Sequence, residues 1–204
     1  MVALRDYQYI SPDDYLNLES KSPVKHEYFD GEVFAMAGAT DAHVTIAGNI
    51  FALLLAHLRG SGCRVYVSDM KARIEEFNRF FYPDVMVTCD RRDRETASYK
   101  QFPKLIIEVL SDSTEAFDRG GKFEAYQSLE TLEEYVLINP KRSRIDCFRR
   151  SEFQTQSQTQ SQTQSQTWTL HSFTEGHFSI ASVNFEGAIE DLYENVIFEI
   201  DRQS

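Results

Sequence analysis

One short segment restricts the fold of this chain of 204 residues more than any other. The run from Lys104 to Leu110, KLIIEVL, is apolar throughout its interior except at Glu108. A continuous apolar run of this length is typical of a central β-strand that is covered on both faces. An ionised carboxylate is costly to bury unless it is paired or bound to a metal. The run therefore predicts an α/β fold with a doubly covered sheet, and it predicts a partner for Glu108.

A second acid occurs in a similar setting. Asp84 follows Pro83 at the start of the strand-like segment 84–88, DVMVT. Two carboxylates on adjacent strands can hold one Mg²⁺ ion, because this ion prefers hard oxygen ligands. Such an ion can polarise a phosphoryl oxygen and lower the pKa of a bound water. The alternative is that each acid is solvated at a strand end or pairs with an arginine.

The rest of the pattern predicts helices around such a sheet. Apolar residues recur at helical spacing over 41–59, and a short helix is predicted over 121–129. Ser11 and Pro12 form a helix start, and Asp30-Gly31 is a hairpin-turn signal. Further strands are predicted over 63–67, 70–74, 134–138 and 144–149, a polar loop over 91–100, and a helix or helix-strand unit within 184–200.

Length and composition favour one domain over residues 1–204. Within it, residues 154–167 read QTQSQTQSQTQSQT and contain no apolar side chain. Such a repeat cannot form a core, so we expect a disordered loop. Because it separates two strand-like segments, we interpret it as an overgrown hairpin loop.

The cysteines favour reduced thiols. Cys63, Cys89 and Cys147 are far apart, and none belongs to a CxxC pair. The N-terminal sequence has no secretory signal, and no stretch of 18 apolar residues predicts a membrane span. We therefore expect a cytoplasmic protein with buried free cysteines.

The formal net charge of −11 argues against indiscriminate binding to nucleic acid. Binding of that kind requires lysine and arginine to neutralise phosphates. A protein of this charge that acts on DNA needs a local basic surface, or metal ions that offset its acidic residues.

Seven motifs in a fixed order carry a family resemblance. They are YFDGEV, the helix beginning at His43, SDMKARI, YPDVMV, IIEVLSDST, DRGGKFEAY and EEYVLINP. The order resembles the restriction endonuclease family that is abundant in cyanobacteria, a branch of the PD-(D/E)XK nucleases, over about residues 7–150. The resemblance implies a mixed central sheet flanked by helices, with terminal hairpins that extend the sheet. It also implies hydrolysis of DNA with Mg²⁺ or Mn²⁺.

The resemblance also assigns roles to residues. Asp84 and Glu108 match the two acids of the superfamily pattern and would bind the metal. The pattern places a lysine two residues after the second acid, where this chain has Leu110. In the resembling family the lysine lies on the following helix, which points to Lys122 as the residue that positions or activates the water. Taken alone, Lys122 could equally be a solvated surface charge.

Glu32 and His43 are further candidates for the catalytic site, because the first helix of PD-(D/E)XK folds often contributes a polar group near the metal. The simpler alternatives are a solvated hairpin carboxylate and a histidine bonded to the helix backbone. Glu27 is a weaker alternative to Glu32. Three other residues could line the site: Asp69, Lys71 and Tyr126.

Three functions remain open at this point. The favoured one is an endonuclease that acts on DNA, and we expect a homodimer, since enzymes that cut both strands often pair. The second is a non-catalytic binding or assembly protein that keeps the nuclease fold, which the acidic charge and Leu110 favour. The third is a metal-dependent hydrolase of small phosphate esters, for which the negative charge is no obstacle.

Overall fold

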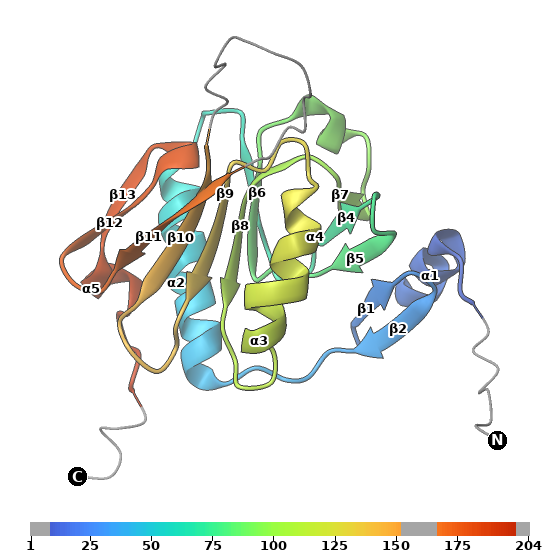
Figure 1. Ribbon diagram of the computed structural model, residues 1–204, viewed down its shortest axis with the longest axis horizontal. Helices are drawn as coiled ribbons and strands as arrows, with labels where there is room; N and C mark the ends of the chain where they lie inside the picture. The colour runs from blue at the N-terminus through green and yellow to red at the C-terminus, as the bar shows by residue number, and fades with distance from the viewer. Residues whose placement is uncertain (1–8, 152–166, 199–204) are drawn as a thin grey trace, which may run out of the picture.

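The apolar run around Glu108 forms β8 (Pro103–Val109), an inner strand of a six-stranded sheet in the computed structural model, which describes residues 9–151 and 167–198 (Figure 1). Strand β8 pairs antiparallel with β6 and parallel with β9, so the predicted mixed central sheet is confirmed. In spatial order the strands are β11 (Trp168–Phe173), β10 (Ile145–Arg150), β9 (Glu134–Ile138), β8, β6 (Val85–Thr88) and β3 (Arg64–Val67).

Helix α2 (Asp41–His57) covers one face of this sheet (Figure 1). The Thr40 side chain accepts a hydrogen bond from the His43 amide and so caps the first turn. The helix buries Ile46, Ile50 and Leu54 completely against the sheet. Each such side chain stabilises the fold by about 1.5–3 kcal/mol through removal from water. The predicted helix is therefore confirmed, and it ends two residues before the predicted limit.

A second helical segment covers the opposite face of the central sheet (Figure 1). It runs through α3 (Glu115–Phe117), a single π-helical turn η2 (Asp118–Lys122) and α4 (Phe123–Gln127). The predicted short helix began at Gly121, so the observed segment starts six residues earlier. A π-helical turn inside an α-helix is rare and is often found at functional sites.

A second sheet of five strands packs beside the central one. Its turn at Asp30 and Gly31 has φ values of 42° and 100°, the left-handed conformation that the hairpin signal requires. Helix α1 (Pro12–Glu19) packs Tyr15 onto Tyr28 and Phe80 of this sheet. In spatial order the strands are β2 (Glu32–Ala35), β1 (His26–Phe29), β5 (Arg79–Phe81), β4 (Lys71–Ile74) and β7 (Tyr99–Lys100).

The terminal hairpins do not extend the central sheet, contrary to the sequence-based expectation. The N-terminal hairpin belongs to the second sheet, and β12 (His177–Ile180) and β13 (Phe185–Ala188) form a separate sheet of two strands. Between them lies η3 (Ala181–Val183), and α5 (Ile189–Leu192) is only one turn long. The β12–β13 hairpin and α5 pack against α2, because their apolar side chains complete the hydrophobic cluster between α2 and the central sheet.

The polar segment 91–100 is more ordered than its composition predicts. It contains a 3₁₀ turn, η1 (Arg91–Arg94), and the short strand β7, which pairs parallel with β4. The carboxylate of Asp93 is buried and accepts hydrogen bonds from the Thr88 hydroxyl and the Gln101 amide. Prediction of a loop failed here because polar groups organise this segment, and hydrophobic periodicity does not detect them.

The strands on either side of the polar repeat pair with each other. β10 and β11 are antiparallel, with Arg150 opposite Trp168. The repeat therefore connects two neighbouring strands, as the hairpin interpretation requires. The predicted disorder concerns residues 154–167, and all of these except Thr167 lie outside the described ranges.

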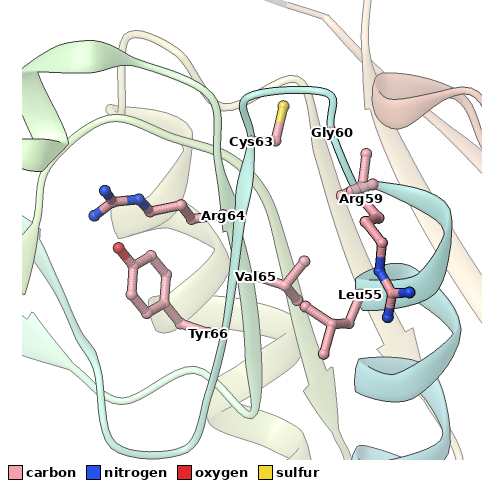
Figure 2. Close-up of a pocket in the computed structure, with 8 residues that line it drawn as sticks. Leu55, Arg59, Gly60, Cys63, Arg64, Val65 and Tyr66 are labelled. Carbon is pink, nitrogen blue, oxygen red and sulfur yellow. The ribbon is translucent and has the colours of Figure 1, made fainter.

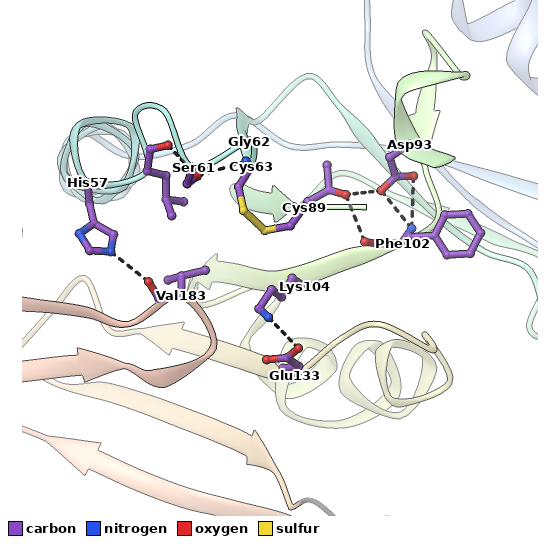
Figure 3. Close-up of a disulfide and its surroundings, with 12 residues drawn as sticks. His57, Ser61, Gly62, Cys63, Cys89, Asp93, Phe102, Lys104, Glu133 and Val183 are labelled. Atoms are coloured by element: carbon purple, nitrogen blue, oxygen red, sulfur yellow. Dashed lines mark hydrogen bonds and ion pairs between the residues drawn. A yellow bond between two sulfur atoms is a disulfide. The ribbon is translucent and has the colours of Figure 1, made fainter. Parts of the chain in front are cut away.

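The prediction of three free cysteines is wrong for two of them. Cys63 and Cys89 form a disulfide, and only Cys147 is free and buried (Figure 3). The pairing of β3 with β6 places Arg64 opposite Thr88, so the residues just outside the ladder face each other. Their separation of 26 residues concealed this contact in the sequence.

In the described ranges, no helix has the length and apolar character needed to cross a membrane.

Asp146 on β10 provides a test of the fold through pH. Its buried carboxylate lies 3.1 Å from Arg119, 3.0 Å from Arg144 and 2.7 Å from the Ser172 hydroxyl. Burial alone would raise the pKa of this carboxyl, but the hydroxyl and the two guanidinium groups lower it below its ordinary value. We expect Asp146→Asn to reduce the free energy of unfolding at pH 7 by about 1.5–3 kcal/mol, the usual contribution of hydrogen bonds to charged groups.

The sign of the pH dependence follows from the lowered pKa. The stabilising contribution is present above the ordinary pKa of an aspartate and is lost as the pH falls through the folded value. The free energies of unfolding of the wild type and Asp146→Asn should therefore begin to converge as the pH falls below about 3.9, the ordinary aspartate pKa, and become equal only below the lowered folded value. The exposed Asp191, changed to Asn, is the matched control. A difference between wild type and Asp146→Asn that persists unchanged at pH 2.5 would contradict the assignment.

Candidate active site

Asp84 and Glu108 face each other across adjacent strands. The ladder pairs Val85 with Ile107, and its continuation by one residue brings the two acids into register. The Val109 amide donates to Asp84 Oδ2 at 2.7 Å, and the Asp84 amide lies 3.3 Å from Glu108 Oε2. The expectation of two acids on neighbouring strands is therefore met by hydrogen bonds that tie each carboxylate to the other strand.

Lys122 reaches these acids from the π-helical turn. Its Nζ lies 3.0 Å from Glu108 Oε1, 3.2 Å from Glu27 Oε1 and 3.6 Å from Asp118 Oδ1. Only 7% of the Lys122 side chain is exposed. The lysine is therefore a buried ion-pair partner, and the alternative of a solvated surface charge is excluded.

The placement of Lys122 accounts for Leu110. Residues 108 and 110 point to the same face of β8 and its extension, and Leu110 is buried in the apolar cluster with Ile106 and Leu137. The position that the superfamily pattern gives to lysine is thus part of the core here. A lysine from the helix that covers the same face reaches Glu108 instead.

His43 lies on the other side of Asp84. It occupies the first turn of α2, and its Nε2 lies 2.9 Å from Asp84 Oδ1. Burial alone would lower the pKa of His43, but the hydrogen bond and the charge of Asp84 raise it above its ordinary value. His43 therefore joins the cluster through its imidazole ring, whereas its backbone amide bonds to Thr40.

The N-terminal hairpin contributes Glu27, and Glu32 lies apart from the cluster. Glu32 is exposed on β2, which is the edge strand of its sheet, so β1 separates it from β5. Glu27 lies on β1, binds Lys122 and accepts a hydrogen bond from the Tyr82 amide at 3.4 Å. The acid that was the weaker candidate is therefore the one at the site.

Of the three residues that could line the site, one contacts the cluster and two lie elsewhere. The Tyr126 hydroxyl donates to Glu108 Oε1 at 3.0 Å, so Tyr126 belongs to the cluster. Lys71 instead donates to the Tyr82 hydroxyl at 3.2 Å, and Asp69 is largely exposed and pairs with Lys25.

Asp118 is a member of the cluster that sequence reasoning missed. Its side chain is 3% exposed, and it lies four residues before Lys122 in the same helical segment. That spacing, in the motif DRGGK, is the signal that could have identified it, because residues four apart on a helix are neighbours.

Negative charge is in excess at this cluster. The carboxylates of Glu27, Glu108 and Asp118 contact the ammonium of Lys122, and a fourth acid, Asp84, lies beside Glu108 on the neighbouring strand. Burial raises the pKa of Glu108 well above its ordinary value; Lys122 opposes this shift, and the neighbouring Asp84 and Asp118 add to it.

Lys122 itself stays protonated. Burial alone would lower its pKa, but the surrounding carboxylates raise it far above the ordinary value. The side chain can therefore donate hydrogen bonds and stabilise negative charge.

The donor set is compatible with a hard divalent cation. Mg²⁺ is usually held by one or two protein carboxylates together with waters and substrate phosphates. Asp84 and Glu108 supply two adjacent carboxylates, and a cation would offset the excess negative charge. Over the described ranges, no three His, Cys, Asp or Glu side chains are arranged as a preformed metal cage. The residues therefore fit a cation completed by water or substrate.

The sequence comparisons now identify the family. The model of the Uma2 family, described as "Putative restriction endonuclease", matches residues 12–183. The chain belongs to the Uma2 family.

Two relatives from Synechocystis sp. extend this family match. The chain is 41% identical over 143 residues to "Uncharacterized protein slr1290", covering 70% of this chain and 75% of the relative. It is 32% identical over 152 residues to "Uncharacterized protein sll1609", covering 74% and 86%.

A solved structure shows the same fold. It is described as a "putative nuclease belonging to DUF820" from Anabaena variabilis, with a TM-score of 0.69 and 16% identity over 92% of this chain and 99% of that one. The restriction-endonuclease-like α/β fold that the sequence predicted is confirmed. Uma2 membership, together with this fold, supports a nuclease.

The Lys122 ion pairs can be tested by their effect on stability. Lys122→Met leaves Glu27, Glu108 and Asp118 without their shared cation, and removal of one partner from a buried pair costs about 3–5 kcal/mol. We expect urea denaturation to show a loss of this size. The double variant Lys122→Met/Glu108→Gln should recover part of it, because one buried charge is then removed as well. Equal stability of Lys122→Met and wild type would contradict the proposed ion-pair network.

Proposed function

We propose that this protein is a divalent-metal-dependent endonuclease that hydrolyses phosphodiester bonds of DNA. The observation that carries the proposal is the convergence of Asp84, Glu108 and Lys122, with Lys122 Nζ 3.0 Å from Glu108. Membership of the Uma2 family supports the reaction class. The contacts support these three residues as one site. Position 110, where the superfamily pattern has its lysine, is a buried leucine in this chain.

Asp84 and Glu108 would hold the metal ion. When bound, Mg²⁺ or Mn²⁺ would polarise the scissile phosphate and lower the pKa of a water molecule. The protein holds both carboxylates in place before substrate arrives: the Val109 amide binds Asp84, and the Tyr126 hydroxyl binds Glu108. Outer hydrogen bonds of this kind orient metal ligands and tune their basicity.

Lys122 would act as a fixed positive charge. Because its pKa is raised, it would donate hydrogen bonds to the attacking water or to a phosphate oxygen that gains charge in the transition state. Glu27 and Asp118 would keep the ammonium in position from the sides away from the substrate. His43 would restrict the rotation of the Asp84 carboxylate through its contact with Oδ1.

Supercoiled plasmid with Mg²⁺ or Mn²⁺ is the direct test. We expect nicking by the wild type and loss of nicking in the double variant Asp84→Ala/Glu108→Ala. Lys122→Gln should reduce the rate by about 10²–10³, the usual effect of removing one donor that stabilises transition-state charge. Glu32→Gln is the matched control, since this acid is exposed on β2, and it should cut at the wild-type rate.

Three results would overturn the proposal in different directions. Nicking at equal rates by the wild type and the Asp84→Ala/Glu108→Ala variant would place the reaction elsewhere. No heat of Mn²⁺ binding in calorimetry, combined with no nicking, would favour a binding or assembly protein. Hydrolysis of mononucleotides or small phosphate esters without cleavage of DNA would replace the polymer by a small substrate.

A further inference from the structure

Two short segments of this acidic chain are rich in arginine. Residues 59–64 read RGSGCR and residues 89–94 read CDRRDR, and together they hold five arginines and two aspartates, a formal charge of +3. The chain as a whole has a formal charge of −11. Each segment also contains one of the two bonded cysteines.

The fold brings these segments together at one corner. Segment 59–64 connects α2 to β3, and segment 89–94 follows β6, the antiparallel partner of β3. The Cys63–Cys89 disulfide joins them covalently (Figure 3). The Arg94 guanidinium adds a hydrogen bond to the Gly62 carbonyl at 3.2 Å. We refer to residues 59–64 and 89–94 together as the arginine corner.

Most of the positive charge of the arginine corner is available to a ligand. Arg59, Arg64 and Arg91 are exposed, and the structure records no ion pair or side-chain hydrogen bond for them with any described residue. The two aspartates are already engaged: Asp90 binds Arg92 at 2.6 Å, and Asp93 is buried against Thr88. The exposed acid that follows the second segment is Glu95.

The arginine corner also borders a surface pocket. A pocket of about 420 Å³ is lined by Leu55, Arg59, Arg64, Val65 and Tyr66, among others. Figure 2 shows the Arg59 and Arg64 side chains extending to opposite sides of β3. Because β3 is the edge strand of the central sheet, a long ligand can contact both sides of it.

We propose that the arginine corner binds the phosphate backbone of duplex DNA, on the flank of the bond that the Asp84 site cleaves. This inference rests on the proposed function for the identity of the ligand. Every cation in the two segments is arginine, whose planar group matches a phosphate with two hydrogen bonds. A local patch of this kind answers the objection that an acidic chain repels DNA.

The position of the arginine corner along β6 gives its distance from the Asp84 site. Five residues along β6 separate Asp84 from Cys89, which corresponds to about 17 Å at roughly 3.3 Å per residue. That length matches about five base pairs of duplex at 3.4 Å each. For a duplex whose axis follows β6, the arginine corner would contact phosphates about five base pairs from the scissile bond.

The decisive experiment measures binding of a 30-base-pair duplex in EDTA, so that cleavage plays no part. We compare the wild type with Arg59→Gln/Arg64→Gln/Arg91→Gln, which leaves Arg94 and its bond to Gly62 intact. The slope of log K against log salt should become shallower by about 3, since each lost phosphate contact removes about one unit. Lys21→Gln, an exposed cation on the turn after α1, is the matched control and should keep the wild-type slope. Thermal unfolding of all variants checks that the fold is unchanged.

A second variant tests the role of the disulfide. Cys63→Ser/Cys89→Ser keeps every arginine but removes the covalent link between the two segments. Only the covalent link is lost, since the Arg94–Gly62 hydrogen bond and the β3–β6 pairing remain. We expect several-fold weaker duplex binding at 100 mM salt with a salt slope close to that of the wild type. Wild-type affinity in this variant would show that the disulfide does not organise the arginine corner.

The outcomes separate this inference from the proposed function. A triple variant with the wild-type salt slope refutes the arginine corner, and nicking of plasmid by that variant would leave the proposed function standing. Arginine-dependent duplex binding by a wild type that never nicks DNA supports the arginine corner and refutes the nuclease. Binding to anionic phosphatidylserine vesicles in preference to duplex would overturn the inference in favour of a membrane surface.

Discussion

The ammonium of Lys122 is the group on which the rest of the site depends. It lies within 3.6 Å of carboxylate oxygens from β1, β8 and its own helical segment, so a single cation joins both sheets and the helix between them. Without it, buried carboxylates would face one another at a cost of several kcal/mol. The same contact holds Glu108 beside Asp84, where the metal would bind. Stability and proposed catalysis therefore depend on the same charge.

Charge is also distributed unevenly on a larger scale. The cluster around Lys122 is more negative than this lysine can neutralise, and a divalent cation would complete it. The arginine corner lies at the other end of β6 and carries the opposite sign. An acidic protein with this arrangement would recognise a polyanion at one place and position it over a metal at another. Net charge alone therefore says little about the ligand, because local fields decide where a phosphate can approach.

Contacts that leave no periodic pattern in the sequence explain where sequence reasoning failed. Cys63 and Cys89 meet only because β3 pairs with β6, and their spacing resembles no metal or redox motif. Glu27, and not Glu32, contacts Lys122, because β1 lies nearer to this lysine than the edge strand β2 does. Segment 91–100 is ordered by the buried carboxylate of Asp93, which periodicity cannot reveal. For the cysteines and Glu27 the deciding partner lies far away in the chain, whereas the partners of Asp93 are near in sequence but follow no periodic pattern.

The sequence by itself was enough to single out Asp84 and Glu108, the long helix α2 and the central strand β8. A carboxylate inside an apolar run and a helical repeat of apolar residues are both local patterns. It also determined the family, through seven motifs in order. Only the tertiary structure showed that the Lys122 ammonium reaches Glu108, that Glu27 from the other sheet contacts the same ammonium, and that a disulfide joins the two arginine segments. The physical reason is range: ion pairs, disulfides and surface charge join residues that are far apart in the chain, and only the fold brings them together.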